Sequence, residues 1–257
     1  HNTASDDLVY AMRLVNFSRN LKKEGKLGEQ DDYRILLYSI DWPVDIQIDL
    51  INSILEFPKI NQGIISCVGI LPKKEIEKIQ KKISLIFLNQ DSKLPFKLQY
   101  STTDTLGSDR LALVAAACNQ YNGKNVLVID AGSCITYDFV DKNKNYFGGA
   151  IAPGINMRYS SLAHFTSGLP NLQKKIPQHL TGNSTDSCIH SGIVNGVLNE
   201  IEGAVKEYQN KHPDLTVILT GGDTDFLCKQ LKISIFANSD FLLEGLNFLL
   251  EINSNQL

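Results

Sequence analysis

The chain has 257 residues, enough for one large domain or two of ordinary size, and 43% of them are hydrophobic, so a substantial core can form. A net charge of −3 argues against nucleic acid as a partner, because a nucleic-acid binder needs a basic surface to displace counterions from phosphates. The five cysteines include no CxxC pair, so neither a zinc site nor a disulfide framework is indicated. No signal peptide and no membrane-spanning apolar stretch is present, so we expect a cytoplasmic protein with no membrane partner.

Short β-branched runs alternate with longer helical periods along the chain. The predicted strands are 34–39, 64–68, 85–88, 126–130, 135–140 and 216–219. The predicted helices are 45–55, 73–82, 109–121, 187–208, 224–231 and 241–252. This alternation indicates an α/β protein whose buried strands are covered by helices. We place a domain boundary near Leu106, after a loop at 101–105, which gives domains 1–105 and 106–257.

Lysines crowd the segment 73–82, where Ile76, Ile79 and Ile83 recur at helical spacing. This pattern is typical of an amphipathic helix with a solvated basic face, and we prefer it to a nucleic-acid patch. Further along, residues 126–150 read as strand, glycine turn, strand, polar turn and strand. That order predicts a series of antiparallel hairpins, followed by the helices that cover them.

The first candidate site follows the predicted strand 126–130. Gly132 permits a tight turn whose backbone N–H groups can point at a phosphate. The hydroxyls of Ser133 and Thr136 can bond phosphate oxygens, and Asp130 at the strand end can hold a cation beside them. The alternative is an ordinary hairpin turn whose carboxylate is satisfied by local backbone.

The second candidate site is the turn Thr220, Gly221, Gly222, Asp223, which follows an apolar strand and opens a helix. Two glycines at such a turn let a nucleotide lie against bare backbone near the positive end of the helix. The alternative is a simple connection in which Asp223 serves as the helix N-cap.

The third candidate site lies before the predicted helix 109–121. Asp109 beside Arg110 at a helix start offers a base and an anion-binding fork within one turn. The alternative is an N-cap aspartate followed by a surface arginine. A fourth segment, 182–185, leads into a helix that contains Gly192 and Gly196, whose small size suits close helix packing or a hydroxyl contact at the helix start.

Taken in chain order, these segments resemble the type III pantothenate kinases. The matching segments are Tyr100, 106–110, 130–138, 148–154, 169–170, 182–185, 191–192 and 220–223. The likeness runs from residue 64 to about residue 246 in the expected order and spacing. It implies an actin-like, or ribonuclease H-like, pair of α/β domains with a cleft between them, working as a homodimer.

The resemblance also implies roles for individual residues. Asp109 would be the general base on the pantothenate hydroxyl, and Asp130 matches the position of a monovalent cation, potassium or ammonium. The pantothenate site would be lined by Tyr100, Gly107, Ser108, Asp109, Arg110 and Thr185, the last from the partner subunit. The ATP site would include Asn2, Thr3, Gly132, Ser133, Thr136, Gly221 and Gly222. Magnesium would accompany the nucleotide.

Members of this family begin with a strand and an Asp-x-Gly-Asn-Thr loop that binds ATP phosphates. Here the sequence opens with His1, and only Asn2 and Thr3 match that loop. Three explanations are open: residues before His1 are missing from the sequence, the loop has been lost, or a different N-terminus replaces it. Loss of the loop would remove backbone donors and a carboxylate from the ATP site.

The sequence therefore predicts ATP-dependent phosphorylation of pantothenate to 4′-phosphopantothenate, the first step towards coenzyme A. One alternative is a non-catalytic paralogue that acts as an accessory or regulatory binding protein, which the incomplete first loop would favour. Another is a kinase of the same superfamily that acts on a different small hydroxyl substrate. Tyr100 and the segment 107–110 weigh against that second alternative.

Overall fold

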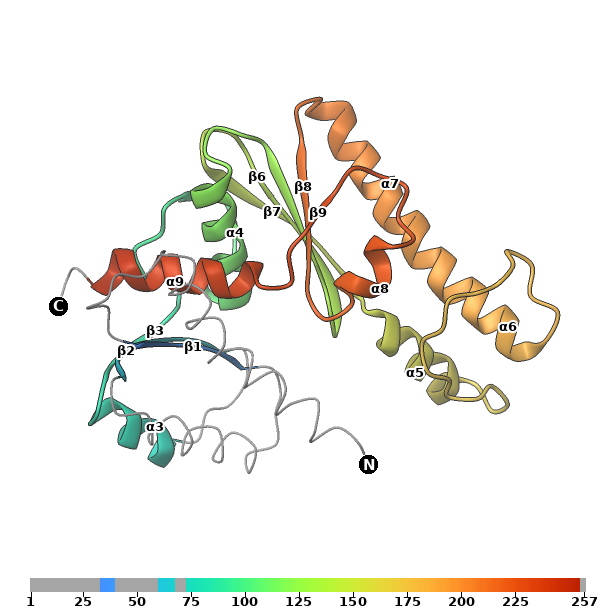
Figure 1. The fold of residues 1–257 in the computed structure, drawn as a ribbon, viewed down its shortest axis with the longest axis horizontal. Coiled ribbons are helices and arrows are strands. Elements are labelled where there is room, and N and C mark those ends of the chain that lie inside the picture. The colour runs from blue at the N-terminus through green and yellow to red at the C-terminus, as the bar shows by residue number, and fades with distance from the viewer. Residues whose placement is uncertain (1–32, 40–59, 68–72, 255–257) are drawn as a thin grey trace. The chain divides into compact units, whose positions relative to one another are not determined.

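The computed structural model describes residues 33–39, 60–67 and 73–254. The chain forms two compact α/β units, so the predicted α/β class is confirmed (Figure 1). The first unit takes His1–Pro95, Ser101–Asn119 and Asp240–Leu257, and the second takes Phe96–Tyr100 and Gln120–Ser239. These units differ from the expected single boundary near Leu106. The chain passes between them several times because a short strand in 96–100 pairs with the second unit, whereas the last helix packs in the first.

The first unit is built on a three-stranded parallel sheet in the order β1-β2-β3. Its strands are β1 (Tyr33–Ser39), β2 (Ile60–Cys67) and β3 (Ser84–Phe87). Helix α3 (Lys73–Gln80) buries Ile76 and Ile79 while its lysines are exposed, which confirms the predicted amphipathic helix. The predicted helix 45–55 lies outside the described residues.

Two apolar helices complete the first unit, α4 (Ser108–Gln120) and α9 (Phe241–Ser254). Helix α4 is buried on nearly all sides from Leu111 to Cys118. The two helices cross at Gly245, where an added methyl group would lie 2.0 Å from the carbonyl oxygen of Ala112. Only glycine therefore allows this approach. Asn253 of α9 also accepts a hydrogen bond from the backbone N–H of Lys93 and donates one to its carbonyl.

The second unit is built on a six-stranded mixed sheet in the order β4-β7-β6-β5-β8-β9. Its strands are β4 (Lys97–Leu98), β5 (Val126–Ala131), β6 (Cys134–Val140), β7 (Asn145–Pro153), β8 (Thr216–Thr220) and β9 (Phe236–Ala237). Strands β5, β6 and β7 pair in antiparallel fashion, which confirms the predicted hairpin series. Strand β8 runs parallel to β5 on the other side.

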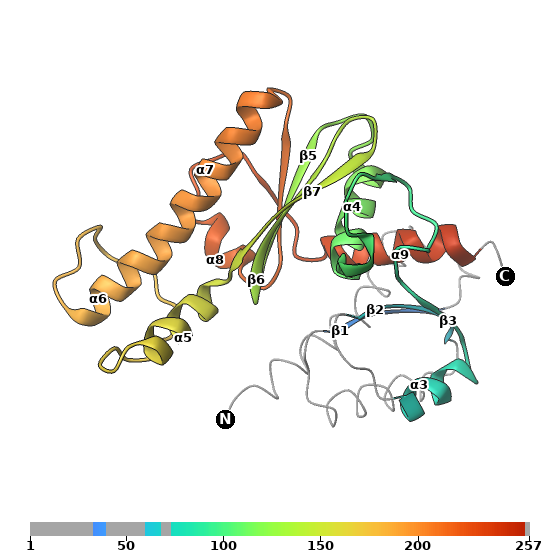
Figure 2. The same ribbon diagram turned by 180° about the vertical axis from the view of Figure 1, so that it is seen from behind.

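Helices cover one face of this sheet (Figures 1 and 2). They are α5 (Ile155–Phe165), α6 (Thr185–His190), α7 (Gly196–Lys211) and α8 (Thr224–Cys228). The covered face carries apolar side chains such as Leu127 and Ile129, which pack against the helices. Because side chains alternate along a strand, the opposite face carries Asp130, Thr136 and Asp138, which the strand register places together.

The structure corrects two expectations about the segment after residue 182. The predicted helix 187–208 is two helices, α6 and α7, joined by a π-helical stretch at Ser191–Asn195. Close helix packing does not explain Gly192 and Gly196, because a methyl group added at either would meet nothing within 4 Å.

The expected loop at 101–105 contains one 3-10 turn, Thr103–Thr105. None of the described helices has the length and apolarity needed to span a membrane.

Candidate active site

The two glycine turns predicted to bind ATP lie side by side in the second unit. Strands β5 and β8 are parallel neighbours, and their register pairs Asp130 with Thr220 at the carboxyl end of each strand. Beyond that pair, the backbone N–H of Asp223 donates a hydrogen bond of 2.9 Å to the carbonyl of Ala131. Parallel strands bring the turns that follow them to one edge of the sheet, so segments 90 residues apart form one surface.

Glycine is required where these turns touch. Gly221 has φ of +93°, in the left-handed region, and an added methyl group would lie 2.3 Å from Asp130 Oδ1 and 2.4 Å from the Ala131 carbonyl oxygen. Gly132 is different, since a methyl group there would meet nothing within 4 Å. The first turn therefore presents bare backbone, with the exposed side chain of Ser133 beside it.

The hydroxyl of Thr136 is directed along its own strand. It donates a hydrogen bond of 3.1 Å to Asp138 Oδ2. A hydroxyl has one proton, so in this arrangement Thr136 gives its donor to a carboxylate. The predicted contact of Thr136 with phosphate stays a prediction.

Asp223 occupies the N-cap position of α8, but its side chain makes no capping hydrogen bond. Its buried carboxylate instead forms an ion pair with Lys174, whose ammonium group also lies 5.5 Å from the centre of the Phe226 ring. This pair ties the long loop after α5 to the second glycine turn. Sequence reasoning missed it because Lys174 belongs to no recognisable pattern.

The end of β7 also contacts the first glycine turn. The backbone N–H of Gly154 donates to the Ser133 carbonyl at 3.1 Å, and a methyl group at Gly154 would lie 2.1 Å from the Gly132 carbonyl oxygen. One residue earlier, the carbonyl of Pro153 accepts a bond of 2.9 Å from Arg158 Nε. Both glycine turns are thus fixed by neighbours within the same unit.

Arg158 is itself held by a carboxylate on α7. Its Nη2 lies 2.8 Å and 3.1 Å from the two carboxylate oxygens of Glu200. Burial raises the pKa of the nearby Tyr137 hydroxyl, and the negative charge of Glu200 raises it further. Tyr137 therefore stays neutral beside this ion pair.

The third candidate site lies in the first unit, at the start of α4. Asp109 Oδ1 accepts a hydrogen bond of 2.8 Å from the backbone N–H of Arg110. Gly107 makes room for this carboxylate, because a methyl group there would lie 2.4 Å from the same oxygen. The Ser108 hydroxyl lies 2.9 Å from that of Ser66 on β2, which fixes the helix start against the sheet. The surface-arginine alternative is wrong, since Arg110 is only 5% exposed.

Tyr100 belongs to the second unit, directly after β4. Its ring is stacked on that of Tyr146, with centroids 6.3 Å apart and planes within 3°. Gly148, at φ of +95°, leaves space for it, because a methyl group there would lie 2.8 Å from two carbons of the Tyr100 ring.

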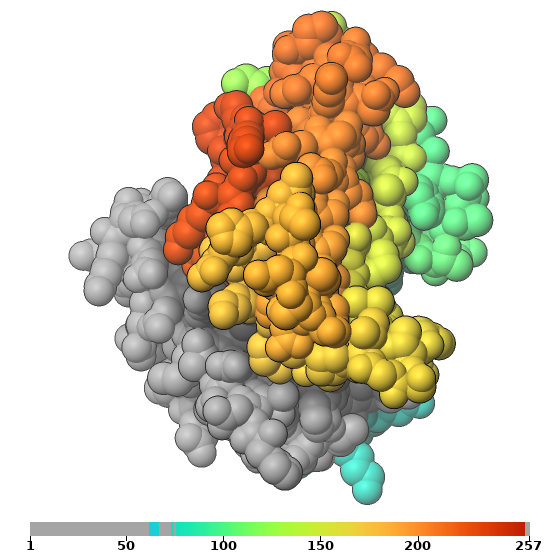
Figure 3. Space-filling view, turned by 90° about the vertical axis from the view of Figure 1, so that its right-hand side faces the viewer, coloured from blue at the N-terminus to red at the C-terminus, as the bar shows by residue number. Residues whose placement is uncertain are grey.

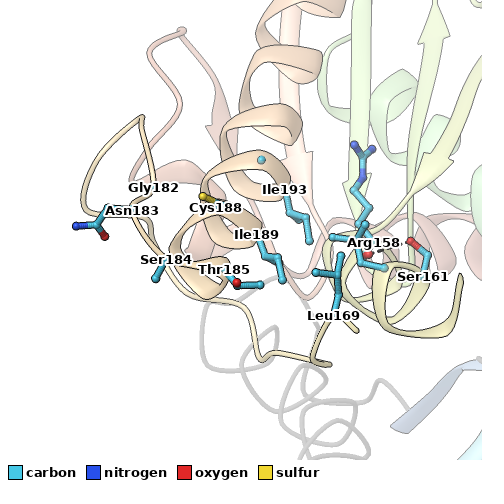
Figure 4. A pocket seen from close by; sticks show the side chains of 12 residues that line it. Arg158, Ser161, Leu169, Gly182, Asn183, Ser184, Thr185, Cys188, Ile189 and Ile193 are labelled. Atoms are coloured by element: carbon cyan, nitrogen blue, oxygen red, sulfur yellow. Dashed lines mark hydrogen bonds between the residues drawn. The ribbon is translucent and has the colours of Figure 1, made fainter. Parts of the chain in front are cut away.

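Thr185 is exposed at the first position of α6, beside an open groove of about 940 Å³ (Figure 4). A capping box fixes the helix start, since Ser184 and Ser187 exchange side-chain and backbone hydrogen bonds. The groove is lined by Arg158, Ser161, Leu162, Leu169, Gly182, Asn183, Ser184, Thr185, Cys188, Ile189, Gly192 and Ile193. Figure 3 looks onto the face where α5 and α6, in yellow and gold, lie in front of α7.

The predicted site residues thus fall into separate groups. Asp130, Gly132, Ser133, Gly221 and Gly222 come together at one sheet edge of the second unit. The group of Gly107, Ser108, Asp109 and Arg110 forms the start of α4 in the first unit. The predicted ATP contacts Asn2 and Thr3 lie outside the described residues.

Comparison with known proteins identifies the family. A family model described as type III pantothenate kinase matches residues 39–207. The chain belongs to the type III pantothenate kinase family. Membership carries with it the actin-like pair of α/β units that the resemblance implied, and it identifies the chain as a kinase.

Relatives within the family match over most of their length. The type III pantothenate kinase of Christiangramia forsetii is 52% identical over 201 residues, which cover 78% of this chain and 83% of the relative. That of Flavobacterium psychrophilum is 48% identical, covering 74% of this chain and 78% of the relative. A crystal structure of a conserved Baf family protein from Campylobacter jejuni superposes with a TM-score of 0.58 at 24% identity, covering 86% of this chain and 98% of that chain. This last likeness shows the fold alone.

The chemistry of the paired turns fits the phosphate groups of a nucleotide. The backbone N–H of Gly132 already donates to the Cys134 carbonyl at 2.8 Å, but the open space beside this glycine leaves room for a phosphate, and the exposed Ser133 hydroxyl can donate a hydrogen bond to its oxygens. Within 33–39, 60–67 and 73–254, no group of three His, Cys, Asp or Glu residues is placed to hold a metal ion. Magnesium commonly keeps several waters and is held by substrate phosphates with one or two carboxylates, so it needs no such group of protein ligands.

Proposed function

We propose that this chain transfers the terminal phosphoryl group of ATP to the hydroxyl of pantothenate, giving 4′-phosphopantothenate on the route to coenzyme A. The observation that carries the proposal is the hydrogen bond from Asp223 N–H to the Ala131 carbonyl, which joins two glycine turns into one surface. Family membership supplies the substrate, because the relatives are named for pantothenate.

ATP would lie with its phosphates on the first turn, against Gly132 and Ser133, and its nucleoside against Gly221 and Gly222. Phosphoryl transfer depends on positioning and on neutralising charge, so donors that are fixed before the substrate binds favour the transition state. Magnesium bound to the phosphates would supply most of that charge. Asp130, at the end of β5, is our candidate for holding a monovalent cation, potassium or ammonium, beside them.

Asp109 is our candidate for the general base. Its carboxylate would orient the pantothenate hydroxyl and accept the proton as the bond to phosphorus forms, late in a loose transition state. The backbone N–H of Arg110 and the space at Gly107 already hold one oxygen of that carboxylate, which supports this role. No covalent intermediate is needed.

The remaining pantothenate contacts are proposed on the same basis. Pantothenate carries a carboxylate, and Arg110 offers a planar fork of donors for such a group. Tyr100 offers an aromatic face, and Gly107 and Ser108 offer backbone donors. Burial of Arg110 to 5% exposure supports a fixed orientation of its guanidinium.

The direct test is a coupled assay for ATP- and potassium-dependent phosphorylation of pantothenate, with the phosphorylated product identified by mass spectrometry. Asp109→Asn should lower kcat roughly a hundredfold or more, because general base catalysis typically contributes that much. Asp104→Asn, an exposed aspartate on the preceding 3-10 turn, is the matched control and should keep wild-type activity.

The outcomes separate the alternatives. No product from a folded wild-type protein, with no ATP binding by calorimetry, would favour a non-catalytic accessory protein. ATP turnover with another small alcohol in a substrate panel, but not with pantothenate, would favour a different kinase of the superfamily. Full activity of Asp109→Asn would remove that residue from the proton transfer.

We also propose that the enzyme is a homodimer in which Thr185 completes the partner subunit's pantothenate site. The exposed apolar side chains of Phe165 and Leu180, 82% and 79% exposed, support a protein partner on this side of the second unit. Light scattering gives the oligomeric state. Mixing Asp109→Asn with Thr185→Val subunits should restore on the order of a quarter of wild-type activity, because only mixed dimers then carry an intact site. A Thr185 that acts within its own subunit would give no restoration.

We place the enzyme in the cytoplasm. Its proposed substrate ATP is abundant there, and the four cysteines with described side chains, Cys118, Cys134, Cys188 and Cys228, are all free thiols, as a reducing compartment maintains. Fractionation of the native cell with an antibody to the chain tests this placement, and recovery in an extracytoplasmic fraction would contradict it.

A further inference from the structure

A fully buried carboxylate lies on the polar face of the second unit's sheet, and no role has been assigned to it so far. Asp138 on β6 is 0% exposed. Its Oδ1 accepts a hydrogen bond of 2.6 Å from the hydroxyl of Tyr146, and its Oδ2 accepts one of 3.1 Å from Thr136. Burying a carboxylate is costly unless its oxygens are well bonded, so a side chain retained here acts through the groups it holds.

Tyr146, which the Asp138 carboxylate holds in place, contacts the ring of Tyr100. Tyr146 is itself 0% exposed, and its hydroxyl is fixed by Asp138 at one end while Phe96 packs edge-on at a centroid distance of 5.8 Å. The Tyr100 ring lies parallel to it within 3°. Gly148, on the same strand as Tyr146, also approaches the Tyr100 ring, because a methyl group added there would be 2.8 Å from two ring carbons.

We propose that Asp138 and Tyr146 are positioning residues that set the plane of the Tyr100 ring for pantothenate. This inference rests on the proposed function, because it assigns Tyr100 to the substrate site. The hydroxyl–carboxylate bond fixes the rotation and depth of the Tyr146 ring, and stacking transmits that orientation to Tyr100. The reacting groups themselves touch neither Asp138 nor Tyr146.

The Asp138 carboxylate also contacts a residue close to the proposed ATP site. Thr136, which bonds to Asp138 Oδ2, stands opposite Asp130 in the β5–β6 register. Asp138 therefore connects the strand that ends in the phosphate turn with the tyrosine pair. Loss of the Tyr146 bond should nevertheless act on pantothenate alone, because Thr136 keeps its own bond to the other oxygen.

The test is a Tyr146→Phe variant, which keeps the stacked ring and removes only the hydroxyl. We expect the KM for pantothenate to rise about tenfold, the effect of a charge-assisted hydrogen bond, while the KM for ATP changes less than about twofold. Tyr121→Phe is the matched control, since Tyr121 packs on Phe236 of β9, at the far edge of the sheet from β4, and it should leave both KM values unchanged.

A double-mutant cycle separates positioning from a general loss of structure. In a Tyr100→Ala background, Tyr146→Phe should raise the pantothenate KM no further, because the ring through which it acts is absent. Equal rises of both KM values in the single variant, or a full additional effect in the Tyr100→Ala background, would overturn the inference. The Tyr146 cycle decides the inference, because Asp138→Asn would leave one side-chain oxygen for two hydroxyl donors and so would also disturb the bond from Thr136.

Failure of the proposed function gives a different result. A wild-type protein that forms no phosphopantothenate and binds no pantothenate by calorimetry would refute the substrate assignment before any variant is compared. A wild type that is active, with a Tyr146→Phe variant indistinguishable from it, would refute only the positioning role.

Discussion

Replacing Gly221 by alanine tests whether the contact between the two glycine turns controls catalysis. The added methyl group would lie 2.3 Å from Asp130 Oδ1 and 2.4 Å from the Ala131 carbonyl oxygen. Ordinary contact begins near 3.4 Å, so the aspartate or the backbone has to move by about 1 Å. The φ of +93° adds strain that no side chain relieves.

The expected magnitudes follow from these two terms. A side chain in the left-handed region costs about 1–2 kcal/mol, and overpacking a tight contact costs about 1–3 kcal/mol more. The melting temperature should fall by on the order of 10 °C, since each kcal/mol is a shift of several degrees in a domain of this size. A misplacement near 1 Å typically lowers the rate about a hundredfold, and we expect that loss in kcat/KM for ATP.

Gly203→Ala is the matched control, because it makes the same chemical change in an exposed position of α7 where a methyl group would meet nothing within 4 Å. Alanine in a helix interior should stabilise the protein by about 0.5–1 kcal/mol and leave the kinetics unchanged. Circular dichroism gives the melting temperatures, and kinetics are measured well below them. A Gly221→Ala enzyme with wild-type kcat/KM for ATP would refute the reasoning.

Three further changes test the site and one hydrogen bond outside it. Gly132→Ala should leave the melting temperature unchanged, because its methyl group meets no protein atom within 4 Å, yet raise the KM for ATP by intruding where phosphate binds; an unchanged KM would mean that phosphate lies elsewhere. Gly107→Ala should push the Asp109 carboxylate from its place, 2.4 Å from the new methyl group, and lower kcat about tenfold or more with the ATP KM little changed, as steady-state kinetics would reveal. The hydrogen bond from Asn125 lowers the pKa of Asp214, so Asn125→Ala should raise that pKa towards its ordinary value in an NMR titration, and a value that stays low would disprove this cause.

Local patterns in the sequence predicted the central strands of the second unit well, but they missed α5 (Ile155–Phe165). The β-branched runs at 126–130 and 216–219 correspond to β5 and β8, and the glycine turns after them come together as parallel neighbours must. Hydrophobic periodicity and turn residues are local signals, so they can be recognised without knowledge of the fold. The same holds for α3, where isoleucines at helical spacing are buried.

Interactions between distant segments could not be predicted in this way. The Lys174–Asp223 and Arg158–Glu200 ion pairs join residues 49 and 42 positions apart that belong to no sequence motif. The π-helical stretch at Ser191–Asn195 interrupts a pattern whose hydrophobic period continues through it. Such features depend on tertiary packing, which overrides local preference.

The way in which the chain is divided between the two units also could not be predicted from local patterns. A loop at 101–105 suggested a boundary, but whether the helices on either side pack with the earlier or the later sheet is decided by side-chain fit. The close crossing at Gly245 is one such fit, since any larger residue would meet the backbone of α4. The residues predicted at the start of α4 rest on a local signal, a glycine before an aspartate at a helix start, and their role in the site stays a prediction.

The pairing of α4 with α9 has a consequence for how the protein is made on the ribosome. Helix α4 ends at Gln120, but the helix that covers it begins only at Phe241, so the apolar surface of α4 stays uncovered until α9 has been made. The second unit, complete at Ser239, can fold before α9 is made, whereas the first unit can close only after α9 has left the ribosome. A premature stop just before α9 would therefore leave a folded second unit joined to an incompletely folded first unit with an exposed apolar surface. Chaperones and proteases recognise such proteins.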